Sequence, residues 1–229
     1  MPPVLRSHDH GPTVLRLHNY WRSSASYRVR IALGLKGLAW DYVAVNIIAD
    51  GGGEQATADY RARNPQAQVP TLELVDGDTR RHLTQSLPII EYLDEVHPTP
   101  PLLPADPYLR ARARALAELV NAGIQPLQNL STTRRVRALG GDDAAWVRDF
   151  MAPGLRAYDA LCQDVRGRFS VGDAPSVADL FLVPQLYSAR RFGVALDELP
   201  ALTAIEAACN TLPAFAAAHP DRQPDARPA

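Results

Sequence analysis

A cluster of prolines between His97 and Pro107 divides this 229-residue chain into two parts of different character. The cluster consists of Pro98, Pro100, Pro101, Pro104 and Pro107. Because proline lacks a backbone N–H and has a fixed φ, we expect this segment to exclude regular helix and to act as a semi-rigid connector. The sequence therefore predicts a linker over residues 98–107 between one domain at residues 13–97 and a second at residues 108–225.

The first part alternates between strand and helix patterns. Residues 14–18 alternate as a strand does, residues 26–35 carry apolar positions at helical spacing before Gly37, and residues 42–45 form a second strand pattern. This β-α-β order predicts parallel strands joined by a right-handed crossover.

A hairpin and a helix follow in the first part. Residues 71–74 and 81–84 read as two strands around a turn at Asp76-Gly77, and residues 87–96 read as a helix. We therefore predict an α/β domain of order β-α-β followed by β-β-α.

The second part contains helical patterns and no convincing strand. The predicted helices cover residues 109–121, 146–162, 177–191 and 202–218. Ser176 and Asp179 have capping-box spacing before the third of these helices, so we assign them a structural role. The fold class expected for the chain is an α/β domain followed by an all-α domain.

Composition excludes several kinds of partner. With 24 Lys and Arg against 25 Asp and Glu, the formal net charge is −1, which gives no electrostatic reason for binding nucleic acid or an anionic membrane. Residues 1–12 lack the apolar run of a signal peptide or anchor, so we expect a flexible extension there.

The cysteines and histidines also limit the chemistry. Cys162 and Cys209 are too few and too isolated for a disulfide scaffold, and we expect two small buried residues in a reducing, cytoplasmic setting. Four histidines lack metal-ligand spacing, so no metal site is predicted. They are His18, His82, His97 and His219.

A run of serines stands where the first helix begins. Ser23, Ser24 and Ser26 follow Arg22 directly after the first strand. The first turn of a helix has unpaired N–H groups and the positive end of the helix dipole, so serines there can cap the helix or stabilise a bound anion such as a thiolate.

The serine run belongs to a series of motifs that stand in a fixed order over about residues 13–225. They are Ser23–Leu33, Gln68–Leu72, Gln85–Leu93, Pro98–Pro104, Gly123–Ser131, Val171–Asp173 and His219–Asp225. Through them the chain resembles the zeta-class glutathione transferases, and especially their maleylacetoacetate isomerase members. The resemblance implies a thioredoxin-like domain, in which a further helix stands between the β-α-β and β-β-α units, followed by an all-helical domain. It also implies glutathione as cofactor and a homodimer.

The resemblance also implies a set of glutathione-binding positions. Val69, before a cis Pro70, would pair with the glutathione backbone as an added strand does. Gln85 and Ser86, at the start of a helix, would receive the γ-glutamyl carboxylate, although a plain helix cap is the alternative for Ser86. The remaining positions are Ser23, Ser24, Ala25, Ser26, Tyr27 and Arg28, and, from the helical domain, Gln125, Asn129, Leu130 and Ser131, for which contacts between helices are an equal alternative.

One residue departs from the family pattern. The family has Cys as the third residue of its Ser-Ser-Cys-Ser run, and this chain has Ala25. The only candidate nucleophile at this position is therefore the sulfur of glutathione itself. Ser24 is our first choice for the donor of a hydrogen bond to that thiolate, and Ser23 is the second.

Two arginines match positions that bind the substrate carboxylate in related maleylpyruvate isomerases. They are Arg22 and Arg191, and arginine suits this task because its planar guanidinium binds a carboxylate through two hydrogen bonds. The alternative is an ordinary surface charge, which is the interpretation we favour for Arg190.

These residues together predict a glutathione-dependent cis–trans isomerase of a small dicarboxylate. The first expectation is conversion of maleylacetoacetate to fumarylacetoacetate in tyrosine and phenylalanine catabolism. Maleylpyruvate of gentisate degradation is compatible with the same residues. A transferase acting on α-haloacids and a non-catalytic binding protein on the same scaffold are the other hypotheses.

Overall fold

A computed structural model describes residues 13–227 of the chain; the predicted extension at residues 1–12 lies outside them. A four-stranded sheet of order β2-β1-β3-β4 forms the first domain. Strand β1 (Val14–Asn19) pairs in parallel with β2 (Asp41–Ala44) and antiparallel with β3 (Thr71–Asp76), which pairs with β4 (Thr79–Thr84). The predicted β-α-β unit and hairpin are both confirmed.

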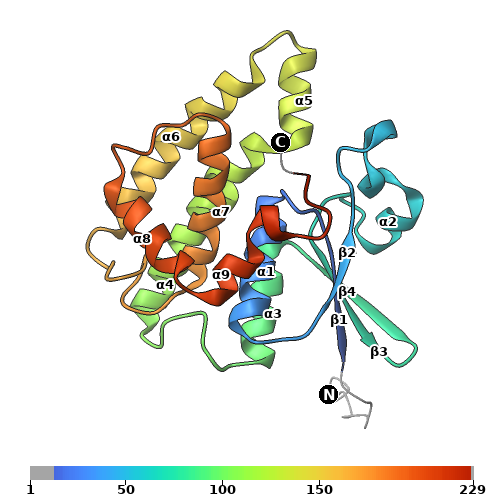
Figure 1. The fold of residues 1–229 in the computed structure, drawn as a ribbon, viewed down its shortest axis with the longest axis horizontal. Helices are drawn as coiled ribbons and strands as arrows, with labels where there is room; N and C mark the ends of the chain where they lie inside the picture. Colours follow the sequence, from blue (N-terminus) through green and yellow to red (C-terminus); the bar gives the residue numbers. More distant parts are fainter. Residues whose placement is uncertain (1–12, 228–229) are drawn as a thin grey trace, which may run out of the picture.

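Helices cover both faces of this sheet (Figure 1). Helices α1 (Ser24–Leu35) and α3 (Ser86–Val96) lie between the sheet and the rest of the molecule, and α2 (Ala58–Arg63) lies on the outer face. Two 3₁₀ turns precede α2, η1 (Asp50–Gly52) and η2 (Glu54–Ala56). This is the expected thioredoxin-like arrangement.

The second domain is helical, as predicted. Its elements are α4 (Pro107–Glu118), a π-helix (Leu119–Ile124), a 3₁₀ turn (Gln125–Gln128), α5 (Leu130–Ala138), α6 (Asp143–Cys162), α7 (Val177–Arg191), α8 (Pro200–Asn210), α9 (Pro213–Ala218) and η5 (Pro220–Arg222). Within residues 13–227, the only β pairing outside the sheet is an isolated bridge between Arg166 and Gly172.

Three details differ from the predicted elements. Pro107 is not part of the linker but opens α4, at a position where its missing N–H costs no helical bond, and Asp106 caps the helix by accepting the N–H of Leu109 at 2.8 Å. The single helix predicted over residues 202–218 is broken into α8 and α9, because Pro213 cannot continue α8. Helix α5 was not predicted, since its sequence is polar and rich in arginine and threonine.

The capping box before α7 is confirmed. Asp179 is fully buried and accepts the backbone N–H groups of Ser176 and Ser170, each at 2.8 Å. Its carboxylate thus joins the start of α7 to the preceding loop, which is a structural role. Cys162 and Cys209 are free and buried, also as expected.

The two domains meet along α1. Helix α1 packs against α3 on one side and against α7 and α9 on the other. A methyl group added at Gly34 would lie 3.1 Å from the Ala214 Cβ, so glycine allows α9 to approach closely. At the far end of α1, the buried Lys36 ammonium donates to Asp94 and to the carbonyls of His97 and Pro100, which fastens the linker.

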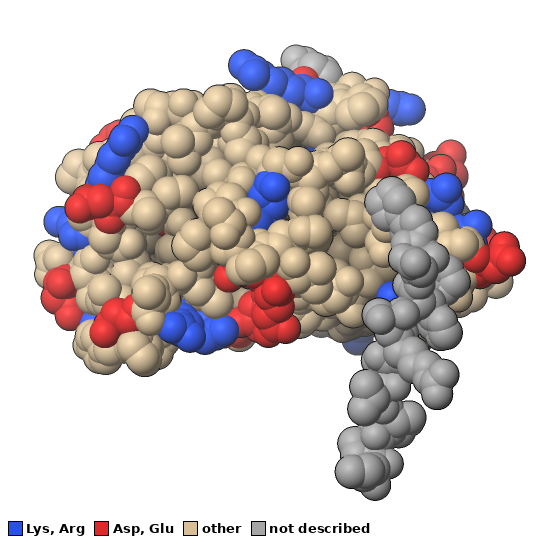
Figure 2. All heavy atoms as spheres, turned by 90° about the horizontal axis from the view of Figure 1, so that it is seen from below, with Lys and Arg blue, Asp and Glu red and all other residues tan. Residues whose placement is uncertain are grey.

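The face of the molecule in Figure 2 carries both acidic and basic side chains, scattered among uncharged ones. Among the described helices, none is long and apolar enough to cross a membrane.

Candidate functional site

A cavity of about 400 Å³ lies between the two domains, a volume within the range of small-molecule sites. The first domain contributes the start of α1, the segment before β3 and the start of α3. The helical domain contributes the π-helix, the 3₁₀ turn and α5. The lining residues are Ser23, Ala25, Arg28, Ile47, Gln55, Asn64, Gln66, Ala67, Gln68, Val69, Pro70, Gln85, Ser86, Asn121, Gln125, Pro126, Asn129, Leu130, Ser131 and Arg134.

The two candidate serines at the start of α1 face different surroundings. Ser23 is the N-cap, where its hydroxyl accepts the N–H of Ser26 at 3.2 Å, and it lines the cavity beside Ala25. Ser24 is buried, lies outside the cavity lining, and its hydroxyl is 2.8 Å from the hydroxyl of Ser188 on α7. The geometry therefore favours Ser23, our second choice, as the hydroxyl available to a ligand.

Ser26 and Tyr27, both expected to contact the cofactor, also lie outside the cavity lining. Ser26 is fully buried, and the Tyr27 ring packs edge-on against the rings of Tyr187 and His219. Successive residues of a helix point about 100° apart, so only some positions of the serine run can reach one cavity.

The segment before β3 offers free backbone groups. The peptide between Val69 and Pro70 is cis, as the resemblance implied. Among the described residues, no hydrogen bond uses the N–H or the C=O of Val69. An extended peptide can therefore pair with Val69 as an added strand would.

The start of α3 closes the same side of the cavity. Gln85 is the N-cap, with a left-handed φ of 69°, and Ser86 is the first helical residue. The Gln85 amide donates to the Gln66 side chain at 2.7 Å. Ser86 is thus not the cap itself, and the unpaired N–H groups of the first turn of α3 begin at the cavity lining, where they can bind an anion.

A buried arginine lies at the base of the cavity. Arg28 is 1% exposed, and its guanidinium donates to the Ser86 hydroxyl at 3.1 Å, to Asn121 at 3.0 Å and to Gln125 at 3.2 Å. All three acceptors are neutral, and its Nε has no partner among the described residues. Burial lowers the pKa of Arg28 to about 9, so the group is charged at neutral pH. The Glu118 carboxylate opposes this lowering of the pKa but forms no ion pair with Arg28, so the cavity contains a cation that favours an anionic ligand.

The helical-domain residues both line the cavity and contact one another. The Gln125 amide donates to Asn129 at 2.9 Å and its carbonyl oxygen accepts from Arg28. Leu130 and Ser131, at the start of α5, complete this side. The contacts between helices that we offered as the alternative are therefore present, and the same residues also line the cavity.

Several lining residues were not predicted. Asn121 lies one helical turn before Gln125, and that spacing next to a predicted site residue was an available signal. Arg134 on α5 reaches the carbonyl of Gly52 at 3.5 Å, and nothing in the sequence indicated this contact.

Arg22 and Arg191 lie near each other beside the serine turn, by which we mean residues 23–26 at the start of α1. Burial lowers the pKa of Arg191, and the positive charge of Arg22 lowers it further. The Arg22 guanidinium lies 5.1 Å from the Trp21 ring centre, and that of Arg191 lies 6.0 Å from the ring centre of Tyr187. Neither arginine forms an ion pair within the described part of the chain. Both are outside the lining of the cavity.

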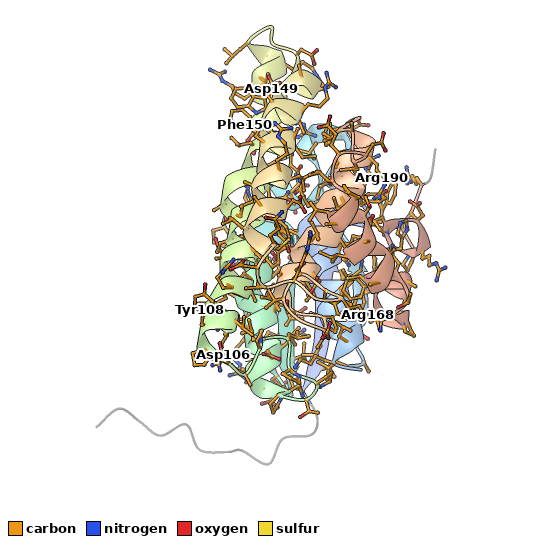
Figure 3. The ribbon with its side chains drawn as sticks, turned by 90° about the vertical axis from the view of Figure 1, so that its left-hand side faces the viewer. Asp106, Tyr108, Asp149, Phe150, Arg168 and Arg190 are labelled. Carbon is orange, nitrogen blue, oxygen red and sulfur yellow. The ribbon has the colours of Figure 1, made fainter. Side chains whose placement is uncertain are left out.

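Arg190 has a different environment. It lies at the edge of the helical domain (Figure 3), where its two terminal nitrogens donate to the Glu206 carboxylate at 2.7 and 2.5 Å. This pairing confirms the prediction that Arg190 is a surface charge.

Comparison with known proteins identifies close relatives. The family described as "Glutathione S-transferase, N-terminal domain" matches residues 22–96. The chain is 46% identical over 214 residues to the maleylacetoacetate isomerase of Pseudomonas aeruginosa, covering 92% of this chain and 98% of that protein. It is 44% identical over 217 residues to the maleylpyruvate isomerase of a Ralstonia species, covering 92% and 99%.

Solved structures of a maleylacetoacetate isomerase are also similar to this chain. The maleylacetoacetate isomerase of Anaeromyxobacter dehalogenans is 51% identical, with a TM-score of 0.86 over 94% of this chain and 99% of that chain. It has been solved with glutathione in its active site, and also with dicarboxyethyl glutathione and citrate.

The two buried arginines of α1 should respond differently to replacement by methionine. Arg30 donates to the carbonyls of Ala218 and Trp21 and to Asn19, so Arg30→Met leaves buried acceptors unpaired and should lower the free energy of unfolding by about 3 kcal/mol or more. Neither arginine forms an ion pair among the described residues, but the three acceptors of Arg28 line the cavity, where water can pair with them. Arg28→Met should therefore cost less than about 1 kcal/mol. Urea unfolding measures both, and equal losses would contradict this difference between the two sites.

Proposed function

This chain belongs to the zeta class of glutathione transferases, and on that premise we propose that it is a glutathione-dependent cis–trans isomerase whose substrate is maleylacetoacetate. The observation that carries the proposal is the pair of arginines, Arg22 and Arg191, which lie beside the serine turn without an ion-pair partner in residues 13–227. A conjugating enzyme for uncharged substrates would have no use for two such cations, and a simple α-haloacid offers only one carboxylate, whereas a dicarboxylate can pair with both.

Glutathione fits the cavity between the domains through three of its groups. Its cysteinyl backbone would pair with the free N–H and C=O of Val69. Its γ-glutamyl carboxylate would lie at the start of α3, beside the Ser86 hydroxyl and the buried charge of Arg28. Its sulfur would lie at the start of α1, beside Ser23 and Ala25.

Ser23 and the start of α1 would stabilise the thiolate. A hydrogen-bond donor and the positive end of a helix dipole lower the pKa of a thiol from about 8.5 toward neutrality. The Ser23 hydroxyl accepts from the N–H of Ser26, so its own proton is available to the sulfur. Ala25 offers no thiol, which leaves glutathione as the source of the nucleophile.

The reaction then needs only reversible addition. The bound thiolate adds to the conjugated double bond, the resulting single bond rotates, and elimination restores the alkene in the trans form with glutathione unchanged. Arg22 and Arg191 would hold the substrate carboxylates during rotation and offset the negative charge that develops next to them.

Turnover tests this proposal directly. Maleylacetoacetate and maleylpyruvate are each incubated with and without glutathione, while the cis substrate, the trans product and free thiol are measured. Trans product with thiol conserved is the expected result. Loss of thiol without trans product would instead indicate a conjugating transferase, and no reaction of either kind would indicate a binding protein.

Maleylpyruvate is the second candidate substrate. It shares the conjugated double bond and carboxylates, and the Ralstonia relative named for it is 44% identical to this chain. The ratio of kcat/KM for the two substrates in the same assay decides between them.

We also propose a cytoplasmic homodimer. The two cysteines are free and buried, which suits a reducing compartment. Tyr108 on α4 (Figure 3) and Val96 at the end of α3 are 62% and 51% exposed, and such apolar groups suit an interface between copies. Light scattering after size-exclusion chromatography measures the mass in solution.

Replacing each serine separately distinguishes their roles. Ser23→Ala should lower kcat/KM at neutral pH about tenfold or more and raise the pKa of bound glutathione, because it removes the donor to the thiolate. Ser24→Ala should change kcat/KM by less than about threefold, since its hydroxyl contacts Ser188 instead. Thiolate absorbance of bound glutathione, followed against pH, gives the pKa of its thiol. A larger loss of kcat/KM for Ser24→Ala than for Ser23→Ala would instead identify Ser24 as the donor.

Replacing the arginines tests substrate binding. Arg22→Ala and Arg191→Ala should each raise KM for the dicarboxylate about tenfold or more, the cost of losing one charge-assisted contact, with little change in KM for glutathione. Arg190→Ala is the matched control, because that side chain is held by Glu206 and should leave both constants unchanged. Steady-state kinetics with each substrate varied in turn measures these values. Full turnover at low substrate in either variant would exclude a carboxylate clamp, by which we mean the joint binding of the substrate carboxylates by Arg22 and Arg191.

A further inference from the structure

The segment of residues 219–225, which we call the C-terminal strap, crosses from the helical domain to the start of α1 (Figure 1). Its sequence was one of the ordered motifs of the chain, yet none of its residues lines the cavity between the domains. Its side chains instead contact the neighbours of Arg22 and Arg191.

The end of the strap fixes the peptide that precedes Arg22. Asp225 accepts the backbone N–H of Trp21 at 3.2 Å and the hydroxyl proton of Tyr42. The carbonyl of Trp21 accepts from Arg30 at 2.8 Å. The backbone N–H and C=O of Trp21 are therefore both hydrogen-bonded, which fixes the orientation of the backbone that precedes Arg22.

Arg30 ties the strap to the same place a second time. Its Nε donates to the carbonyl of Ala218, the last residue before the strap, at 3.1 Å. One buried guanidinium thus holds both the origin of the strap and the Trp21 carbonyl.

The beginning of the strap contacts the neighbour of Arg191. The Tyr187 hydroxyl lies 3.5 Å from the Asp221 carboxylate, at the limit of a hydrogen bond, and its ring meets the His219 ring edge-on at 5.4 Å. The Arg191 guanidinium lies 6.0 Å from the centre of that Tyr187 ring, within reach of a cation–π contact.

The strap acids do not neutralise the arginines. Within the described part of the chain, neither Asp221 nor Asp225 forms an ion pair with Arg22 or Arg191. The Asp225 carboxylate is occupied by a backbone N–H and a tyrosine hydroxyl. The arginines therefore stay free for a ligand while the strap holds their surroundings.

We propose that the C-terminal strap positions the carboxylate clamp, with Asp225 acting on Arg22 through Trp21 and the pair Asp221 and His219 acting on Arg191 through Tyr187. This proposal rests on the proposed function, which assigns the two arginines to the substrate. A long arginine side chain loses rotamer freedom when it binds, so a fixed backbone and a fixed aromatic ring make binding of the dicarboxylate tighter. Asp225 is then a positioning residue for the substrate and not for glutathione.

The central test replaces Asp225 and measures both Michaelis constants. Asp225→Ala should raise KM for the dicarboxylate about tenfold, as expected for loss of one charge-assisted hydrogen bond, while KM for glutathione stays within about twofold. Combined with Arg22→Ala it should cause little further loss, because the two act through one contact. Arg222→Ala is the matched control, since this exposed strap residue makes no side-chain hydrogen bond or ion pair within residues 13–227.

A binding measurement separates this proposal from the proposed function. Calorimetry with succinate, an unreactive dicarboxylate, in the presence of glutathione should show weaker binding by Asp225→Ala than by the wild type, whether or not either maleyl substrate is turned over. Unchanged succinate affinity, an equal rise in both Michaelis constants, or a lowered Tm with both constants unchanged would overturn the strap proposal. Absence of succinate binding by the wild type would also overturn it, because no clamp would then exist.

Discussion

The burial of α1 on every side is the constraint on which the rest of the structure depends. Nearly all of its residues from Ser24 to Leu33 are buried, including Arg28 and Arg30. A buried guanidinium must be hydrogen-bonded, and α1 alone cannot supply the acceptors. Arg28 therefore takes them from α3 and the helical domain, and Arg30 takes them from the strand end and the C-terminal part of the chain. The same helix thus joins the two domains and forms the base of the site.

The two arginines solve this problem in different ways. Arg30 donates to backbone carbonyls and to Asn19, in contacts that fasten the chain. Arg28 donates only to neutral side chains at the edge of a cavity, and its Nε has no partner among the described residues. An anion in the cavity would balance the positive charge of Arg28. A protein that keeps such a group has exchanged some stability for binding, which is typical of functional sites.

Much of the fold was predictable because local signals and tertiary contacts agree. The turn at Asp76-Gly77, the capping box at Ser176 and the apolar spacing of α7 each specify one local structure. Helix α5 was missed because its stability comes from contacts that its polar sequence does not reveal. Most of the cofactor positions expected from the family resemblance line the cavity, but Ser24, Ser26 and Tyr27 do not. Which serine faces the cavity was not predictable, because that depends on how α7 packs against the first turn of α1.

The least predictable contacts are those between the C-terminal strap and the residues beside the proposed substrate arginines. Asp225 and Trp21 are 204 residues apart in sequence, and nothing local in either segment indicates the bond between them. In the proposed complex, glutathione is bound by groups at the starts of helices, where backbone geometry alone creates an anion site. A small dicarboxylate has no such help, so its arginines require supports from elsewhere in the chain. A fold shared by many enzymes can therefore keep one cofactor site and change substrate by changing what holds a few side chains beside the start of α1 and the end of α7.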